Sequence, residues 1–123
     1  MAPQLPTDQR FEVAQDRPGD GIHLLRLAGA LADGAASRLP ALAREQLAAC
    51  PRLLALDLSD LTGLALAGAR ILEDIAEWAG EADIALCLIV PPDHPVRAVL
   101  VAADLGELFE LHPDLPTAIA EMS

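Results

Sequence analysis

Two glycines near the middle of the chain have the spacing of a phosphate-binding loop. Gly63 and Gly68 enclose four residues in the segment GLALAG. In such a loop a lysine and a serine or threonine follow the second glycine, and they bind the terminal phosphate and magnesium. Ala69 and Arg70 occupy those places here, so neither group has a side chain to bind it. The segment therefore does not predict nucleotide binding.

The other residues that could do chemistry do not form a catalytic or metal-binding pattern. No histidine has a second ligand type at the spacing of a zinc site, and no serine has the flanking glycines of a nucleophile elbow. Glu73 and Glu77 favour a solvated helix face over a catalytic pair, and Cys50 and Cys87 are predicted to be buried or half-buried free thiols. The sequence thus predicts a protein that is not an enzyme and holds no metal or cofactor. The histidines are His23, His94 and His112, and each is predicted at the surface or as a helix cap. The serines are Ser37, Ser59 and Ser123.

The charge of the chain narrows the class of partner. Nineteen acidic residues stand against eight arginines and no lysine, which gives a formal net charge of −11. An acidic surface repels phosphate backbones and anionic lipids, so nucleic acid and membrane surfaces are disfavoured and a basic protein partner is favoured. With no tyrosine and only three aromatic residues, the chain also has no platform on which bases could stack.

The distribution of apolar residues indicates a soluble protein. The chain is 53% hydrophobic, yet no apolar run reaches the roughly 18 to 20 residues that span a bilayer. The first ten residues, MAPQLPTDQR, lack the basic start and apolar core of a signal peptide. The sequence therefore predicts a cytoplasmic protein without membrane insertion.

Strands and helices alternate along the sequence. Runs at 11–15 and 22–28 flank the turn-forming segment DRPGDG and predict an opening β-hairpin. Nearly continuous apolar runs at 52–58 and 84–90 suit central strands that are covered on both faces. The predicted architecture is a single α/β domain with a mixed four- to five-stranded β-sheet and about four helices packed on it.

The helices are predicted from apolar periodicity and from capping residues. The first helix has Leu39, Leu42, Ala43 and Leu47 at helical spacing and Ser37 as its cap, and the second buries Ile71, Leu72, Ile75, Trp78 and Ala79 and ends at Gly80. The third is capped by Asp93 and has Val96, Val99, Leu100 and Ala103 on one face. A short strand at 108–111 precedes the fourth helix, at 116–122, which Asp114 begins.

The stretch from Leu53 to Trp78 contains the candidate working surface. It reads as a strand, a turn from Asp60 to Leu66 and a helix that opens at Gly68. A buried strand that leads directly into a helix presents the turn, with its free backbone N–H groups, at one edge of the domain. A partner or ligand could reach it there.

The chain resembles the STAS domains, whose best-known members are the bacterial anti-sigma factor antagonists. The segment LRLAGALA (25–32) is similar to their second strand and the bend after it, and LLALDLSDLTGL (53–64) to their signature strand, Asp-Leu-Ser-x-Val/Leu-Thr. Residues 68–113 resemble the following helix, strand, helix and Leu-x-x-Leu-Phe element. The resemblance assigns residues 10–123 to a STAS-like domain and leaves residues 1–9 as a flexible N-terminal tail.

The chain departs from the family where phosphorylation would act. Regulated members carry Asp-Ser-Ser-Gly, or a close variant, at the opening of the helix, whereas this chain has Ala65-Leu66-Ala67-Gly68. The position that the resemblance gives to the phosphorylatable serine is Leu66. A phosphoserine would add about −1.5 to −2 charge beside the free N–H groups, and leucine cannot be phosphorylated. The family aspartate at the first bend is also replaced, by Ala32, with Asp33 beside it.

The resemblance implies a protein-interaction module that regulates a sigma factor pathway. The implied partner is an anti-sigma factor of the GHKL kinase type or another regulatory protein. Without the serine, binding would be constitutive or controlled by the partner. The implied contact residues are Asp60, Thr62, Leu64, Ala65, Leu66, Ala67 and Gly68.

Other interpretations stay open at this point. The domain could be an assembly subunit, either as a homodimer or as a small cytoplasmic component of a multi-protein complex such as a lipid transport system. It could also bind a small apolar or anionic ligand between sheet and helices. The apolar residues 64–67 could form an exposed patch of the kind that marks a protein interface, or they could pack into the core.

Overall fold

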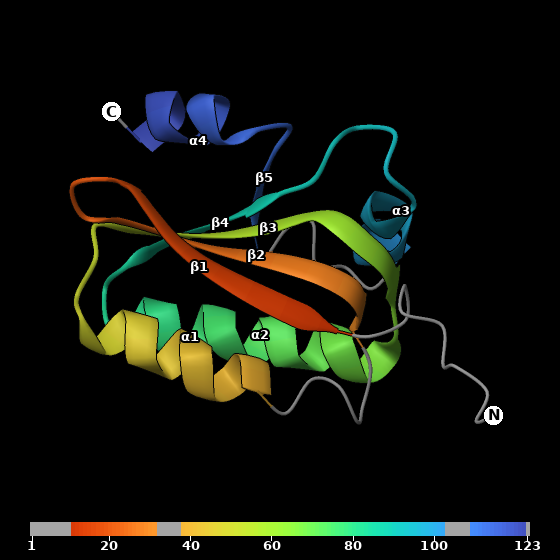
Figure 1. Cartoon of the computed structure of the whole chain (residues 1–123), viewed down its shortest axis with the longest axis horizontal. Coiled ribbons are helices and arrows are strands. Elements are labelled where there is room, and N and C mark those ends of the chain that lie inside the picture. Colours follow the sequence, from red (N-terminus) through yellow and green to blue (C-terminus); the bar gives the residue numbers. More distant parts are fainter. Residues whose placement is uncertain (1–10, 32–37, 103–108, 123) are drawn as a thin grey trace, which may run out of the picture.

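A five-stranded sheet in the order β1-β2-β3-β4-β5 forms the centre of the domain (Figure 1). The computed structural model describes residues 11–31, 38–102 and 109–122. β1 and β2 are antiparallel and the other neighbours are parallel, so the predicted mixed sheet with an opening hairpin and four helices is confirmed. The elements are β1 (Glu12–Gly19), β2 (Ile22–Leu31), α1 (Arg38–Ala48), β3 (Leu53–Leu64), α2 (Leu66–Glu81), β4 (Ala85–Ile89), α3 (Pro95–Ala102), β5 (Glu110–His112) and α4 (Leu115–Met122).

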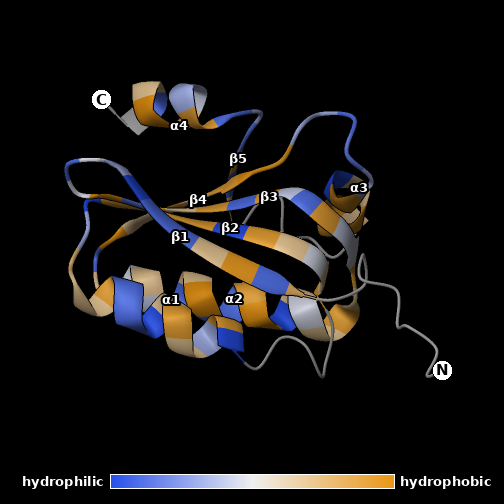
Figure 2. Cartoon of the chain, viewed as in Figure 1, coloured by the Kyte–Doolittle hydropathy of each residue, from blue (hydrophilic) through white to orange (hydrophobic). Residues whose placement is uncertain are grey.

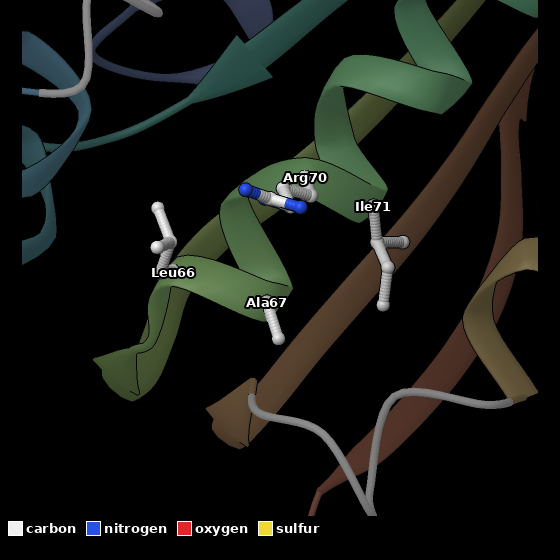
Figure 3. Close-up of a pocket in the computed structure, with 4 residues that line it drawn as sticks. All are labelled: Leu66, Ala67, Arg70 and Ile71. Atoms are coloured by element: carbon white, nitrogen blue, oxygen red, sulfur yellow. The ribbon is translucent and has the colours of Figure 1, made fainter.

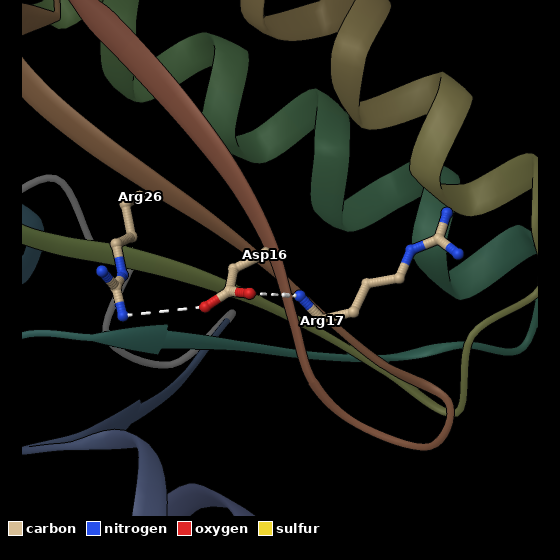
Figure 4. A network of polar contacts seen from close by, with 3 residues as sticks. All are labelled: Asp16, Arg17 and Arg26. Atoms are coloured by element: carbon tan, nitrogen blue, oxygen red, sulfur yellow. Dashed lines mark hydrogen bonds and ion pairs between the residues drawn. The ribbon is translucent and has the colours of Figure 1, made fainter.

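The β1–β2 hairpin closes through a two-residue turn. Gly19 pairs with Ile22, and Gly21 between them has a φ of 71°, a conformation that glycine adopts without strain. Both strands are longer than predicted: β1 includes most of the DRPGDG segment, and β2 continues to Leu31. Across the hairpin Asp16 Oδ2 lies 3.9 Å from Arg26 Nη2, and Asp16 Oδ1 accepts a hydrogen bond from the Arg17 N–H (Figure 4).

Side chains alternate between the two faces of the sheet, and different helices cover each face. In β3, Leu54, Leu56 and Leu58 lie in the large core on the side of α1 and α2, whereas Leu53 and Ala55 lie in a smaller core on the side of α4 (Figure 1). Figure 2 shows the corresponding pattern, with hydrophobic residues along β4 and both kinds of residue alternating along α1 and α2. The two covered faces explain why β3 and β4 are nearly continuous apolar runs.

The apolar stripe of α2 faces the large core, as predicted. Leu72, Ile75 and Ala79 are buried, while Ile71 and Trp78 are half-buried against them. The guanidinium carbon of Arg44 in α1 lies 3.9 Å from the centroid of the Trp78 ring. This cation–π contact joins the two helices on the solvent side of their packing.

The end of α2 differs from the prediction. Gly80 lies inside the helix, which ends at Glu81 with Ala82 as its C-cap. The Ala82 N–H donates to the Trp78 carbonyl, and the positive φ that often follows a helix falls at Asp83, with 62°. The prediction that Gly80 ends the helix is therefore wrong.

The helix α3 is capped by a histidine. His94 Nδ1 accepts a hydrogen bond from the Val96 N–H at 3.1 Å, so the predicted cap at Asp93 is wrong. Val96 and Leu100 are buried, but Val99 is 38% exposed and does not share their face as predicted. The predicted Ala103, like Ser37, Ala32–Asp33 and the tail 1–9, lies outside the described residues.

The closing helix α4 begins as predicted. Asp114 Oδ1 accepts a hydrogen bond from the Thr117 N–H at 2.8 Å. The short strand before it, β5, spans Glu110–His112 instead of 108–111, and residue 108 lies outside the described ranges. Among the helices that the structure describes, none combines the length and the hydrophobicity that crossing a bilayer requires.

We expect Asp114→Ala to lower the melting temperature at neutral pH, because the first turn of α4 loses its cap. The Thr117 N–H holds the pKa of Asp114 below its ordinary value of 3.8. The folded pKa is thus below the unfolded one, so the stabilisation is complete above 3.8 and is lost as the pH falls through the folded pKa. Thermal denaturation at neutral and acid pH measures both effects. Asp114→Asn keeps the cap and should stay close to wild type; an equal loss in both variants would contradict the capping role.

Candidate functional site

The candidate site lies where β3 ends and α2 begins. β3 continues to Leu64, and Ala65 is an extended N-cap residue with φ −87° and ψ 167°. The Ala65 N–H donates to the Leu31 carbonyl at the end of β2, at 3.0 Å, and α2 starts with Leu66. The predicted turn from Asp60 to Leu66 is therefore wrong, and so is the predicted helix start at Gly68.

Pairing with β2 keeps the second half of β3 extended. Ala28 pairs with Asp60 and Leu31 with Leu64, and the register shifts twice along the way. Such irregularities let a strand accommodate aspartate and glycine, which have low intrinsic preference for strands. Tertiary pairing thus overrides the local turn signal of residues 60–63.

The predicted contact residues divide between solvent and core. Leu64 is half-buried and packs against the large core, whereas Leu66 is 69% exposed. The predicted apolar patch is therefore divided: Leu64 packs inward and Leu66 projects into solvent. Of the remaining predicted residues, Asp60, Thr62 and Ala65 are exposed, Ala67 is half-buried and Gly68 is buried.

Gly68 allows the start of α2 to approach β2 closely. A Cβ atom at this position would overlap the Leu31 carbonyl oxygen, and it would lie 2.8 Å from Leu31 Cγ and 3.0 Å from Leu64 Cδ1. The backbone of the helix therefore contacts the end of the strand directly. This contact holds the first turn of α2, which includes Leu66, against the end of β2.

Two further residues complete a surface on the first two turns of α2. Leu66, Ala67, Arg70 and Ile71 line a shallow, open hollow that we call the α2 surface (Figure 3). Leu66 stands on one side of the helix, Ala67 and Ile71 point to the other, and Arg70 lies between them. The sequence prediction stopped at Gly68 and missed Arg70 and Ile71, although each lies four residues after Leu66 or Ala67 and so on the same helix face.

The start of α2 carries positive and apolar character. Ala65 offers no side-chain cap, and the first turn contains no acidic residue. The first N–H groups of a helix lack acceptors within it and give its end a partial positive charge. Residues 64–69 also contain no titratable side chain, so the positive character comes from the backbone N–H groups.

The signature strand has a polar turn of its own just before the site. Asp57 Oδ1 accepts hydrogen bonds from the Ser59 hydroxyl at 2.6 Å and from the Ser59 N–H at 3.0 Å. Both residues are half-buried. These bonds fix the backbone where β3 leaves its regular pairing with β2.

The histidines do not belong to this site. His23, predicted at the surface or as a helix cap, is buried, and its Nδ1 lies 2.6 Å from Gln46 Oε1. Gln46 Nε2 in turn donates to Gln15 Oε1 at 2.9 Å, so the amide oxygen faces the His23 ring as an acceptor. His112 is also buried, which contradicts its prediction as a surface residue, whereas His94 is a cap as predicted.

The two cysteines are free and differ in exposure. Cys87 is buried in the small core as predicted, and Cys50 is exposed, which corrects its prediction. Burial, and to a lesser extent the charge of Glu110, raises the pKa of the Cys87 thiol from 9.0 to about 12. Within the described ranges, no three histidine, cysteine or acidic side chains come together as metal ligands would.

Solved structures with the same fold include two anti-sigma factor antagonists. An anti-sigma factor antagonist from Mycobacterium paratuberculosis aligns with a TM-score of 0.83 and 21% identity, over 96% of this chain and 98% of that one. The anti-sigma factor antagonist SpoIIAA in its unphosphorylated form aligns with a TM-score of 0.73 and 15% identity, over 89% and 95%. A SpoIIAA-like protein of the DUF3478 family from Shewanella loihica PV-4 aligns with a TM-score of 0.63 and 16% identity, over 100% and 99%.

The family assignment comes from the sequence as a whole. None of the curated proteins matches this chain. The family model described as STAS domain matches residues 14–118, which include all five strands except the first two residues of β1. The chain belongs to the STAS domain family.

Proposed function

We propose that this domain regulates a sigma factor pathway by binding an anti-sigma factor of the GHKL kinase type through the α2 surface. The observation that carries the proposal is Leu66, a large apolar side chain that is 69% exposed at the start of α2. Leu66 lies beside Ala67 and Ile71 in the α2 surface, and a contiguous exposed apolar patch is typical of a protein interface. The likeness of the fold to anti-sigma factor antagonists supports this class of partner.

The proposed interaction has no phosphorylation switch at this helix. None of Ala65, Leu66 and Ala67 carries a hydroxyl group, so the first turn cannot acquire the about −1.5 to −2 charge of a phosphoserine. The apolar surface is therefore always present. Binding is constitutive or controlled by the partner.

Leu66→Asp should weaken the complex by one to two orders of magnitude. Burying a leucine side chain contributes about 1.5–3 kcal/mol, and aspartate would in addition place a charge in an apolar contact. The domain itself should remain folded, because a carboxylate in the first turn of a helix is favourable. The measurement is the dissociation constant of the purified chain with a GHKL-type anti-sigma kinase from the same organism.

Two control variants separate the loss of the Leu66 apolar contact from the effect of the added negative charge. Leu66→Asn removes the apolar contact without adding a charge and should show most of the loss. Ala49→Asp adds the same charge at an exposed position beyond α1, and it should bind as wild type. Unchanged affinity of Leu66→Asp would exclude the α2 surface as the contact site.

Affinity purification of the tagged chain from its own cells tests the class of partner. Recovery of an anti-sigma kinase that is lost with Leu66→Asp supports the proposal. Recovery of the chain's own copies alone, or of components of a transport complex, would instead support an assembly subunit.

A further inference from the structure

The first turn of α2 lacks the acidic residue that its positive end would favour, and Arg70 lies just beyond this turn. Arg70 lies four residues after the first residue of α2, near the positive end of the helix dipole. The chain has nineteen acidic residues to choose from, yet the first turn contains none of them. A local rule that is broken without a gain in the folded domain is a sign of function.

Three other arginines of the described chain have side-chain partners, whereas Arg70, like the exposed Arg17, Arg38 and Arg52, has none; of these four, Arg70 is the one that lines the α2 surface. Arg26 pairs with Asp16, Arg44 lies over the Trp78 ring, and Arg97 Nη2 donates to the Val90 carbonyl. Among the described residues, no acidic group lies within 4 Å of the Arg70 guanidinium. Arg70 is exposed, and the acidic residues Glu73 and Asp74 on its own helix do not pair with it.

The Arg70 side chain extends over the first turn of α2 and away from these acids (Figure 3). Long side chains lean toward the N-terminus of their helix and cover the preceding turn. Arg70 leans in this way and lies between Leu66 and Ile71 (Figure 3). The guanidinium group is left as a cation within an apolar surface.

We infer that the partner presents an apolar pocket for Leu66 and, at the rim of that pocket, a carboxylate that binds Arg70. This inference rests on the proposed function and specifies the chemistry of the surface that the partner brings. The occupant follows from charge complementarity, because a desolvated arginine in an interface needs an anionic acceptor. Arginine suits this role, since its planar group can bind both oxygens of a carboxylate.

The net charge of the whole chain and the single charge of Arg70 have different effects on partner recognition. The net charge of −11 attracts a partner whose surface is basic overall, from a distance of several ångströms and without defining its orientation. A single carboxylate opposite Arg70 then favours the register that pairs these two charges within the apolar contact. Leu66 supplies affinity and Arg70 supplies orientation.

Arg70→Glu tests the inference with Arg17→Glu as its matched control. Both changes replace an exposed arginine by glutamate. Arg17 lies in β1 near the hairpin turn, at the end of the sheet where β3 begins, whereas α2 follows the other end of β3. With the purified GHKL-type kinase, we expect Arg70→Glu to raise the dissociation constant at least tenfold and Arg17→Glu to change it less than threefold. Arg70→Lys keeps the charge but loses the paired geometry, so its loss should be intermediate.

A charge exchange identifies the carboxylate. Lysine substitutions of the kinase's surface carboxylates, one at a time, should include one that restores the binding of Arg70→Glu and weakens the binding of the wild-type chain. The inference is overturned if Arg70→Glu and Arg17→Glu have the same effect, or if no substitution restores binding. If Leu66→Asp still weakens the complex in that case, the proposed function stands; if the wild-type chain does not bind the kinase, both are wrong.

Discussion

Gly68→Ala should lower the free energy of unfolding by about 1–3 kcal/mol, the usual cost of forcing extra atoms into a packed contact. The added methyl group would overlap the Leu31 carbonyl oxygen and crowd Leu64 Cδ1. A backbone atom in a sheet cannot turn aside as the end of a flexible side chain can. The start of α2 must therefore move away from β2, and the Ala65 to Leu31 hydrogen bond is strained with it. Urea denaturation at neutral pH measures the change.

Gly80→Ala is the matched control, because it makes the same change in the same helix. A Cβ atom at Gly80 would have no neighbour within 4 Å. Alanine is favoured over glycine in a helix by up to about 1 kcal/mol, so this variant should be as stable as wild type or more stable. Equal destabilisation by the two substitutions would show that close packing at Gly68 is not the cause.

The stability of the domain should fall between pH 9 and pH 12 because of one buried thiol. The pKa of Cys87 rises from 9.0 to about 12 in the folded state, so the unfolded chain releases this proton first. The stabilisation is complete below pH 9 and is lost as the pH rises through the folded value. The difference corresponds to at most about 4 kcal/mol. Chemical denaturation at several pH values across this window measures the slope.

The composition of the chain makes this measurement selective. The chain contains no lysine and no tyrosine, the two side chains that ordinarily titrate in the same range. Cys87→Ala should be less stable than wild type at neutral pH but should lose little further stability up to pH 12. Cys50→Ala should retain the wild-type slope, since Cys50 is exposed. A slope that survives Cys87→Ala would assign the effect to another group.

The architecture was predictable from periodicity and composition because burial on both faces leaves a clear pattern. The apolar runs of β3 and β4 and the stripe of Leu72, Ile75 and Ala79 identified the central strands and the second helix. Element ends were less predictable. Gly80 and Asp93 each carried a strong capping signal, yet the helix continues past the first and His94 caps in place of the second. Capping residues compete over one turn, and the tertiary contacts that decide between them are not local.

The strand and the helix on either side of the candidate site were predictable, but the shape of the junction between them was not. Asp60 and Gly63 suggested a turn, whereas their backbone lies in a strand that is held by β2 through an irregular register. Leu31 accepts the Ala65 hydrogen bond where α2 begins, and its carbonyl oxygen leaves no space for a side chain at residue 68. Leu31 is distant in sequence, so residues 60–68 alone do not reveal this contact. Arg70 was missed because the prediction treated the surface as a loop, whereas it is the face of a helix.

The contact between Arg44 and Trp78 has a spectroscopic consequence. Trp78 is the one tryptophan of a chain without tyrosine, so its indole ring dominates the near-ultraviolet absorbance and the fluorescence of the protein. The ring lies in the same helix as Leu66, and it is half-buried under a guanidinium group of α1. A displacement of α2 relative to α1 would change the polarity around a single fluorophore. The domain thus carries its own optical reporter, and an emission shift on adding a partner would reveal movement of the binding helix without a label.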